Sequence, residues 1–328
     1  MVDLILFKKD EKLTQTLKEG FGLEDLTYDD DFANAISNPI AQWQYVNWDP
    51  AVNVNTFGLY CSAITTIQLS DKSLLTSMAP VLDALNIPPS NGNEIDLTTA
   101  LLNFMTHISL TVPALATSNG QTVSSYLSTH DPAYYSSDTL LDGAWRAWPY
   151  QYCTEWGFLQ SGSGAPPDVK PLVSRIITPE YMSLNCQYAF NLSTPANTDL
   201  VNQYGGLDIA FPRLAFVDGT ADPWLYATPG SPLAKPRANT QSEPAIRIDK
   251  AVHHWDENGL TEEEKKASNG LPPASVKAAQ DELVATVQSW MKDWLLSTIE
   301  TKLDGIQPGG VPQTQVDTSL VVMPEGTD

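Results

Sequence analysis

The sequence is poor in basic residues, with 18 lysines and arginines against 39 aspartates and glutamates in 328 residues. The formal net charge is −21, and the acidic residues are scattered along the chain instead of forming a tail. A negative field of this size repels nucleic acid and anionic membrane surfaces. We therefore expect neither nucleic acid nor a membrane as a partner.

Long hydrophobic runs are also missing. The longest candidate, 97–115, is interrupted by Asn103, His107, Ser109 and Thr111, so it falls short of the roughly 18 apolar residues that span a bilayer. The beginning of the chain, MVDLILFKKDEK, lacks the longer apolar core and the small-residue cleavage site of a signal peptide. These two observations predict a soluble chain without an export signal of its own.

Cysteine is scarce, with three in the whole chain, which excludes a scaffold built mainly from disulfides. Cys153 and Cys186 are close enough in sequence to form a bridge in an oxidising compartment, and Cys61 then remains either as a buried thiol or with a partner elsewhere. A glycosylation sequon at Asn191, Asn-Leu-Ser, is compatible with secretion.

The first part of the chain, to about residue 117, has mainly helical periodicity. Leucines and other apolar residues recur at three- and four-residue spacing over 74–85 and again over 97–108. The second run follows Glu94 and Asp96, and acidic residues are favoured at helix N-termini. The pattern predicts a helical layer.

The middle of the chain, 126–206, is rich in aromatic residues, proline and glycine, and we expect loops with short strands and helices there. Residues 213–217 form a short apolar run ending in Asp218-Gly219, which predicts a strand followed by a turn. Residues 243–252 predict a second strand. Residues 275–301 have helical spacing of apolar residues and predict a helix that packs one face.

A strand, an Asp-bearing loop, a second strand, a His-bearing loop and a final helix occur in the order in which an α/β-hydrolase ends. The first loop contains Asp218 and Asp222, and the second contains His253 and His254. The catalytic site of that fold needs a buried carboxylate that accepts a hydrogen bond from one nitrogen of a histidine ring, so that the other nitrogen can take the proton of the serine. On residue type alone, either aspartate and either histidine fits. For Asp256, which lies in the second loop, we expect a solvated position in a turn.

The nucleophile motif of that fold, Gly-x-Ser-x-Gly, does not occur in the 328 residues. The motif requires small flanking residues because the serine sits on a tight turn between strand and helix. The nearest segment, QSGSG at 160–164, has Ser161 where the first glycine should stand two positions before Ser163. We expect a loop there. His107 and His130 lie outside these motifs, and we expect structural roles for both.

Four ordered motifs give the chain a family resemblance. DGTADPW followed by AVHHWD, with WPYQYCTEWGFLQ and NQYGG upstream, resembles the prolyl carboxypeptidase and dipeptidyl peptidase II family of serine peptidases. The segment NWDPAVNVNTFGLYCSAIT is similar to its secreted fungal members. The resemblance extends from about Leu17 to Trp294, and four motifs in order are more specific than any one of them.

The resemblance assigns the triad acid to Asp222 and the triad base to His253. It implies a serine-type peptidase that hydrolyses peptide bonds after proline through an acyl-enzyme, with a proline-containing peptide as its partner and no metal or organic cofactor. It also implies secretion.

The resemblance places further residues near the substrate. Trp224 and Trp255 flank the acid and the base, where they either pack in the core or line a flat pocket for a proline ring. Phe158 becomes a candidate pocket wall, and Glu155 becomes a candidate contact for the substrate N-terminus or for a neighbouring backbone group. The family pattern also implies a disulfide between Cys153 and Cys186.

The expected fold class is α/β: the C-terminal part of an α/β-hydrolase sheet together with a mainly helical cap, or insertion, domain. We predict the cap with aromatic-rich loops at 1–205, the hydrolase strands and helix with both loops at 206–304, and a loose tail at 305–328. In the family the nucleophile elbow and the early strands precede the cap, so we expect them to be absent. The alternative is a pseudoenzyme or relic fragment that binds proline-containing peptides without cleaving them.

Overall fold

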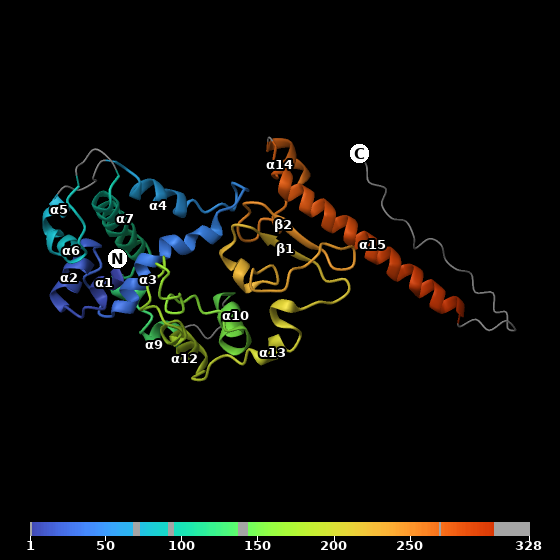
Figure 1. The fold of residues 1–328 in the computed structure, drawn as a ribbon, viewed down its shortest axis with the longest axis horizontal. Coiled ribbons are helices and arrows are strands. Elements are labelled where there is room, and N and C mark those ends of the chain that lie inside the picture. Colours follow the sequence, from blue (N-terminus) through green and yellow to red (C-terminus); the bar gives the residue numbers. More distant parts are fainter. Residues whose placement is uncertain (1, 68–72, 91–94, 137–143, 269, 305–328) are drawn as a thin grey trace. The chain divides into compact units, whose positions relative to one another are not determined.

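The computed structural model describes residues 2–67, 73–90, 95–136, 144–268 and 270–304 (Figure 1). The chain divides into two compact units, the first ending at Ala279 and the second beginning at Gln280. The tail predicted at 305–328 lies outside the described residues.

Helices dominate the first part of the chain. They are α1 (Val2–Leu6), α2 (Glu11–Gly20), α3 (Asp29–Ala41), η1 (Gln42–Tyr45), α4 (Thr56–Ile64), α5 (Ser73–Ser77), α6 (Ala79–Ala84), α7 (Leu97–Ser118) and α8 (Val123–Leu127). Asp96 caps α7, because its side chain accepts a hydrogen bond from the backbone N–H of Thr99. The single helical run expected over 74–85 is divided at Met78, since Pro80 stands in the first turn of α6.

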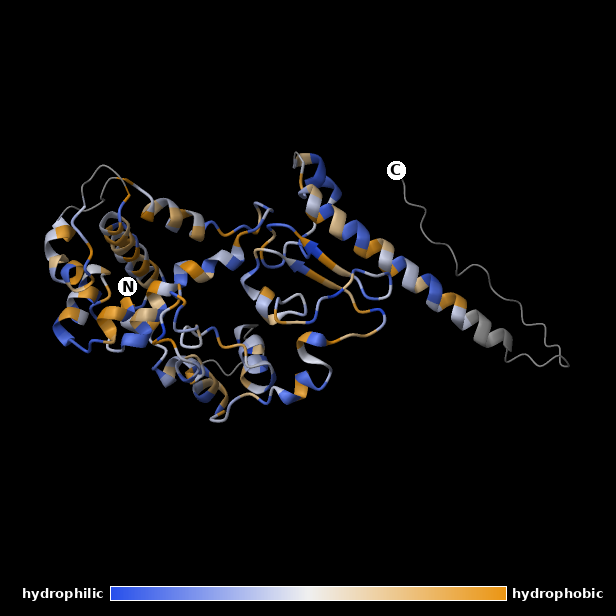
Figure 2. Ribbon diagram, viewed as in Figure 1, coloured by the Kyte–Doolittle hydropathy of each residue, from blue (hydrophilic) through white to orange (hydrophobic). Residues whose placement is uncertain are grey.

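A hydrophobic core joins these helices. The ring of Phe21 at the end of α2 meets Phe32 of α3 and Phe104 of α7 edge to face, with centroids 5.6 and 5.1 Å apart. Figure 2 shows α7 as one of the most hydrophobic helices of the first unit. Its side chains Leu102 and Met105 are almost completely buried in this core. The predicted helical layer is therefore a packed assembly with α7 among its members.

Helix α7 is longer than the expected 97–108, and by length and composition it is apolar enough to cross a membrane. This is weak evidence, because the core helix of a soluble protein passes the same test. The buried side chains of α7 belong to the core cluster of the helical region. The helix also continues through Pro113, although proline usually ends a helix.

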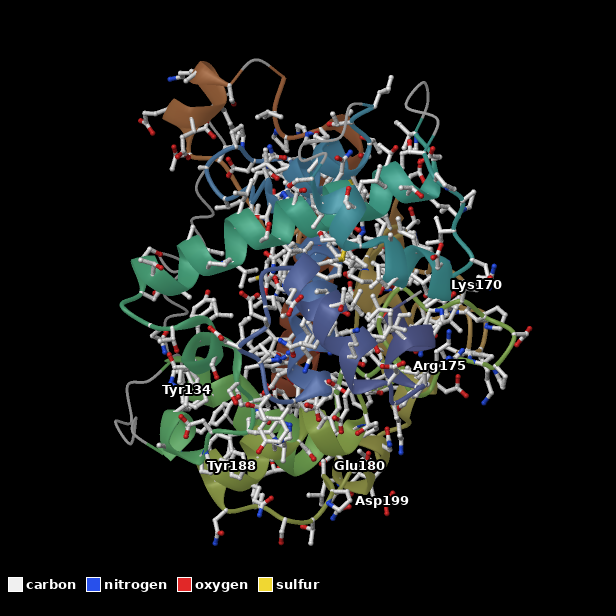
Figure 3. The ribbon with its side chains drawn as sticks, turned by 90° about the vertical axis from the view of Figure 1, so that its left-hand side faces the viewer. Tyr134, Lys170, Arg175, Glu180, Tyr188 and Asp199 are labelled. Carbon is white, nitrogen blue, oxygen red and sulfur yellow. A yellow bond between two sulfur atoms is a disulfide. The ribbon has the colours of Figure 1, made fainter. Side chains whose placement is uncertain are left out.

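The middle of the chain contains short helices, and the described residues between 126 and 206 include no strand, although we expected short strands there. The helices are α9 (Pro132–Ser136), α10 (Ala144–Gln151), the π-helical turn η2 (Tyr152–Trp156), α11 (Pro179–Met182), α12 (Leu184–Phe190), α13 (Asp199–Asn202) and η3 (Gly206–Asp208). Figure 3 labels a side chain on four of them, namely Tyr134, Glu180, Tyr188 and Asp199.

Two short strands, β1 (Phe216–Gly219) and β2 (Ala245–Ile248), pair in parallel, with Gly219 opposite Ile248. β1 begins later than expected: Arg213 has φ of 66°, a left-handed conformation that a strand does not contain, and the N–H of Leu214 closes a turn on the carbonyl of Phe211. A Cβ atom on Gly219 would lie 2.4 Å from the carbonyl oxygen of Ala251. Glycine therefore lets the loop after β1 run close against the loop after β2.

After β1 comes the short 3₁₀ helix η4 (Pro223–Ala227), and after β2 come α14 (Glu262–Ala267) and α15 (Ala274–Asp304). The predicted final helix is present. Val276 lies in the first unit and is buried, whereas Val284, Met291 and Trp294 lie in the second unit, so the expectation that the helix packs one face stays a prediction.

Candidate active site

The loop that follows β1 places the carboxylate of Asp222 at the N-terminus of η4. One carboxylate oxygen, Oδ1, accepts a 2.8 Å hydrogen bond from the backbone N–H of Trp224. Pro223 occupies the first position of η4, where its fixed φ suits a helix start. The Asp-Pro-Trp sequence thus uses one oxygen of Asp222 as a cap and leaves the other for a second partner.

That second partner is His253. Its ring nitrogen Nδ1 lies 2.9 Å from Oδ2 of Asp222, and the two side chains are 25% and 12% exposed respectively. With the proton on Nδ1, the ring donates to the carboxylate, and Nε2 is the nitrogen that can exchange a proton with another group. Among the described residues, no serine hydroxyl is hydrogen-bonded to this ring.

The alternative residues have other partners. The buried carboxylate of Asp218 lies within β1 and accepts a 2.6 Å hydrogen bond from the hydroxyl of Thr228. His254 is exposed, has φ of 64°, and pairs with Glu257 at 2.9 Å. Of the four possible pairs of a candidate aspartate with a candidate histidine, Asp222 and His253 are the pair that the structure joins by a hydrogen bond, and the ring of His254 lies beside that of His253 with centroids 3.6 Å apart.

Two further hydrogen bonds, one between backbone groups and one from a backbone N–H to a side-chain hydroxyl, also join the two loops. The N–H of Ala221 donates to the carbonyl of Ala251 at 3.0 Å, and the N–H of Lys250 donates to the hydroxyl of Thr220 at 2.7 Å. Each bond links a residue shortly before Asp222 with a residue shortly before His253. The separation of the carboxylate and the imidazole is therefore fixed by the main chain as well as by their own hydrogen bond.

A third segment, 42–48 with the sequence QWQYVNW, holds the Asp222 loop from the helical region. The indole N–H of Trp43 donates to the carbonyl of Ala221 at 2.8 Å. The side-chain oxygen of Gln44 accepts a 2.7 Å hydrogen bond from the indole N–H of Trp224. Contacts on both sides of Asp222 thus come from residues about 180 positions earlier in the chain.

The same segment holds the His253 loop. The indole N–H of Trp48 donates to the carbonyl of Trp255 at 2.8 Å, and the indole N–H of Trp255 donates to the carbonyl of Val46 at the same distance. We call residues 42–48 the indole clamp. It ties both loops to one short piece of chain, so it supports the geometry of the Asp222–His253 pair.

The substitution Trp48→Phe tests the indole clamp. Trp48 is buried, and phenylalanine leaves the Trp255 carbonyl without its donor, so we expect unfolding to require about 1–3 kcal/mol less free energy. Urea titration followed by circular dichroism measures this change. Trp145→Phe is the control, since Trp145 is exposed and lies outside the clamp. Equal stability of the two variants would contradict a supporting role for the clamp.

Aromatic rings cover one side of the imidazole. The ring of Trp224 stacks on that of His253, with centroids 5.8 Å apart and an interplanar angle of 25°. Phe158 and Trp148 both meet Trp224 edge to face, at 5.8 and 6.1 Å. Two of the residues expected near the substrate, Trp224 and Phe158, are thus gathered at His253.

Two other residues expected near the substrate lie differently. The indole N–H of Trp255 is bonded to the indole clamp. Glu155 lies on η2 with an exposed side chain. The structure brings neither into contact with the ring of His253.

The disulfide implied by the family resemblance is present in the structure, which joins Cys153 of η2 to Cys186 of α12. Cys61 is half-buried and unbridged. Asn191, at the predicted glycosylation sequon, is exposed at the end of α12 in a left-handed conformation with φ of 56°.

The segment 160–164, the nearest match to a nucleophile motif, is a loop with Ser163 exposed. The guanidinium group of Arg175 donates to the carbonyls of Ala165, Pro166 and Val169 and so organises the chain that follows. Figure 3 shows Arg175 and Lys170 on this part of the chain. The segment has neither the strand nor the helix that would make a nucleophile elbow.

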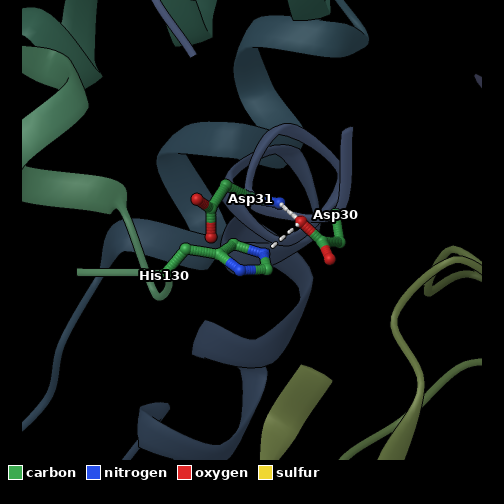
Figure 4. Close-up of side chains that lie close together, drawn as sticks. All are labelled: Asp30, Asp31 and His130. Atoms are coloured by element: carbon green, nitrogen blue, oxygen red, sulfur yellow. Dashed lines mark hydrogen bonds and ion pairs between the residues drawn. The ribbon is translucent and has the colours of Figure 1, made fainter. Parts of the chain in front are cut away.

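Asp30, Asp31 and His130 form the one cluster of possible metal ligands found among the described residues (Figure 4). Nε2 of His130 lies 2.9 Å from Asp30, and buried Asp31 accepts hydrogen bonds from the backbone N–H of Thr129 and the hydroxyl of Tyr181. These contacts satisfy the ligand atoms within the protein, and they fit the structural role expected for His130. Burial raises the pKa of Tyr181, which keeps its hydroxyl a donor.

Electrostatics near the His253 loop centre on Asp256. Burial raises the pKa of this carboxyl above its ordinary value, and the neighbouring charge of Glu257 adds to the rise. A carboxyl whose pKa is raised by folding binds a proton more readily in the folded state, so it favours folding in acid and opposes it as pH rises through that pKa.

A model of the family Serine carboxypeptidase S28 matches residues 89–269. A Probable extracellular serine carboxypeptidase of Arthroderma benhamiae is 42% identical over 88% of this chain and 40% of its own length. Serine protease vicPa of Bipolaris victoriae is 25% identical over 92% of this chain and 54% of its own length. Thymus-specific serine protease of Mus musculus is 28% identical over 45% of this chain and 26% of its own length.

A helical region combined with parallel strands that lead into an Asp loop and a His loop is compatible with an α/β-hydrolase that carries a helical cap. The chain belongs to the family Serine carboxypeptidase S28. This family includes prolyl carboxypeptidase and dipeptidyl peptidase II, so the resemblance drawn from the four motifs is confirmed. The chain spans between about a quarter and a little over half of the length of the curated relatives described above.

Sequence reasoning missed two sets of residues. The indole clamp lies in the region that resembles fungal members, but nothing in the sequence shows what its tryptophans contact. Trp148 and Trp156 lie in the densest aromatic segment, and their ring contacts with Trp224 and Phe158 depend on tertiary packing. In both cases the feature of the sequence that could have pointed to these residues is the unusual density of tryptophan in the segment.

Proposed function

We propose that this chain supplies the acid and the base of an extracellular serine peptidase, with Asp222 orienting His253. The observation that carries the proposal is the 2.9 Å contact between Nδ1 of His253 and Oδ2 of Asp222, on loops that leave neighbouring parallel strands. Membership of the S28 family supports the reaction class, and the name of the Arthroderma benhamiae relative supports secretion.

In the proposed reaction, Nε2 of His253 takes the proton of a serine hydroxyl while the serine oxygen attacks the carbonyl carbon of the substrate. The imidazolium then gives this proton to the leaving amine, and an acyl-enzyme remains. Water attacks the acyl group by the same route and restores the serine. The carboxylate of Asp222 stabilises the imidazolium in both steps through Oδ2. Its other oxygen, Oδ1, accepts the hydrogen bond from the N–H of Trp224, which holds the carboxylate in place.

The proposed substrate class is peptides cleaved after proline. Trp224 offers a flat apolar ring beside His253, and Phe158 borders it, which suits the shape of a pyrrolidine ring. Glu155 and Trp255 remain proposed outer contacts of the same pocket. No metal or organic cofactor takes part in this proposal.

The serine of this reaction belongs to a Gly-x-Ser-x-Gly segment that the 328 residues do not contain. The absence of the motif supports an alternative, in which the chain binds proline-containing peptides without cleaving them. Both candidates place the proline at Trp224, and they differ in whether a bond is broken.

A peptidase assay separates the candidates. Succinyl-Ala-Pro-p-nitroanilide is compared with its Ala-Ala counterpart, using the chain alone and a protein that joins it to a segment with the serine motif. We expect the joined protein to prefer the proline substrate at least about tenfold in kcat/KM, as for a well-matched apolar subsite, and the chain alone to show no turnover. Turnover by the chain alone that survives His253→Ala would contradict the proposal.

A further inference from the structure

The rings beside His253 continue outward as a connected series. Phe158 lies 5.8 Å from Trp224, and Trp156 lies 5.5 Å from Phe158, measured between ring centroids. Trp148 touches both Trp224 and Phe158. We call Trp148, Trp156, Phe158 and Trp224 the aromatic tract. It leads from the imidazole to the surface, so it extends further than a pocket for a single proline ring requires.

The outer rings of the tract remain accessible. Trp148 is 43% exposed and Trp156 is 41% exposed, although indole rings gain free energy when they leave water. Apolar surface left exposed next to a site is a common mark of ligand binding. The position of the tract, continuous with the ring of His253, indicates that its ligand is the substrate itself.

The tract is also rigidly supported. Trp148 stands on α10 and Trp156 ends η2, and the disulfide of Cys153 pins η2 to α12. Gly157 ends this helix with φ of 66°, where a side chain would be strained and would meet Thr198 at 3.0 Å. Rings held on a supported helix present a preformed surface, which lowers the entropic cost of binding.

We propose that the aromatic tract is an extended subsite that takes an apolar side chain two residues from the substrate proline. In an extended peptide, alternate side chains point to the same face at a spacing of roughly 6–7 Å. From a proline held between Trp224 and Phe158, one such spacing outward reaches the gap between Phe158 and Trp156, whose ring centroids are 5.5 Å apart. The inference rests on the proposed function, since it places the proline at Trp224, and it adds that the peptidase selects residues beyond the proline.

The charge of the protein limits which side chains the aromatic tract can bind. The four rings of the tract carry no formal charge, while the whole chain carries −21. An acidic peptide is therefore repelled, and an aromatic or aliphatic side chain is the group that the tract stabilises most. The assignment covers substrates in which the residue two positions from the proline is phenylalanine, tyrosine, leucine or similar.

The test uses isothermal titration calorimetry with the 328-residue chain and three peptides. They are acetyl-Gly-Ala-Pro-Ala-Gly-amide and two versions with phenylalanine in place of the first or the last glycine. We expect one phenylalanine peptide to bind about tenfold more tightly than the glycine peptide, as an aromatic pair allows. Trp156→Ala abolishes that advantage and leaves the affinity for the glycine peptide unchanged.

The matched control is Trp145→Ala, which removes an indole of 40% exposure from α10, the helix that carries Trp148, but outside the tract. It leaves all three affinities unchanged. Equal affinities of the three peptides for the parent chain would overturn the subsite and leave the proposed proline pocket in place. The same conclusion would follow if Trp156→Ala weakened the binding of all three peptides equally. No binding of any peptide by a chain with native circular dichroism would overturn the proline pocket at Trp224 and the subsite together, whereas the roles of Asp222 and His253 are tested by the peptidase assay. A dimer that Trp156→Ala dissociates would assign the tract to a second copy of the chain instead.

Discussion

We expect His253→Ala, made in the protein that joins this chain to a segment with the serine motif, to lower kcat/KM for a proline-linked substrate by about 10³-fold or more. The loss is this large because no other group within the site takes the proton of the serine. Among the described residues, the ring of His253 is the one that lies against Asp222. Steady-state hydrolysis of succinyl-Ala-Pro-p-nitroanilide measures the change.

His254→Ala is the matched control, because this histidine is exposed and pairs with Glu257, and its ring lies beside that of His253 with centroids 3.6 Å apart but has no hydrogen bond to Asp222 among those of the described residues. We expect its kcat/KM to stay within a few fold of the parent enzyme, as for a surface substitution outside the reacting groups. If His254→Ala were the inactive variant and His253→Ala the active one, the assignment of the base would be wrong.

Removing both bridged cysteines, as Cys153→Ala with Cys186→Ala, lowers the free energy of unfolding by about 3–4 kcal/mol on the chain-entropy account. The estimate follows from the separation of 33 residues that the bridge closes. Out of a typical total of about 5–15 kcal/mol, this is a large fraction. Urea titration of the oxidised parent and of the double variant measures it.

Cys61→Ala is the control for the loss of a thiol, because Cys61 is half-buried and takes no part in a bridge. It shifts the urea midpoint far less than the double variant. An unchanged midpoint in the double variant would show that the bridge does not constrain the unfolded chain. The same variants also report on the aromatic tract, since η2 carries both Cys153 and Trp156.

The elements that sequence predicted best are those with strong local signals. The strand before Asp218-Gly219 and the strand near 245–248 were expected, but their limits depended on backbone conformation that residue types do not reveal. Arg213 adopts a left-handed φ, so β1 starts at Phe216. The long helix α7 continues past Pro113, where a proline signal favours an earlier end.

The final helix shows the limit of periodicity arguments. Apolar spacing correctly predicted a helix close to Ala274–Asp304, since the pattern of 3.6 residues per turn is local. The packing of its stripe was not predictable in the same way. Met291 and Trp294 lie in the second unit, and periodicity alone does not say which surface covers such a stripe.

At the candidate site, sequence placed Asp222 and His253 in two loops but could not measure the distance between them. The preference for these residues over Asp218 and His254 came from family motifs. The structure adds the hydrogen-bond partners of all four. The indole clamp was out of reach, because its contacts with Ala221 and Trp255 join residues that are 178 and 207 positions apart.

The most direct measurement of the central assignment is affinity labelling of the chain with a peptidyl-proline chloromethyl ketone. A ring nitrogen of the histidine displaces chloride and forms a stable bond, which peptide mass spectrometry locates. The account predicts alkylation of His253 in preference to His254, slowed by Asp222→Asn and by competing proline peptide, whereas chloroacetamide labels the exposed His254 more readily. Labelling of His254 in preference to His253 by the peptidyl reagent would contradict the account.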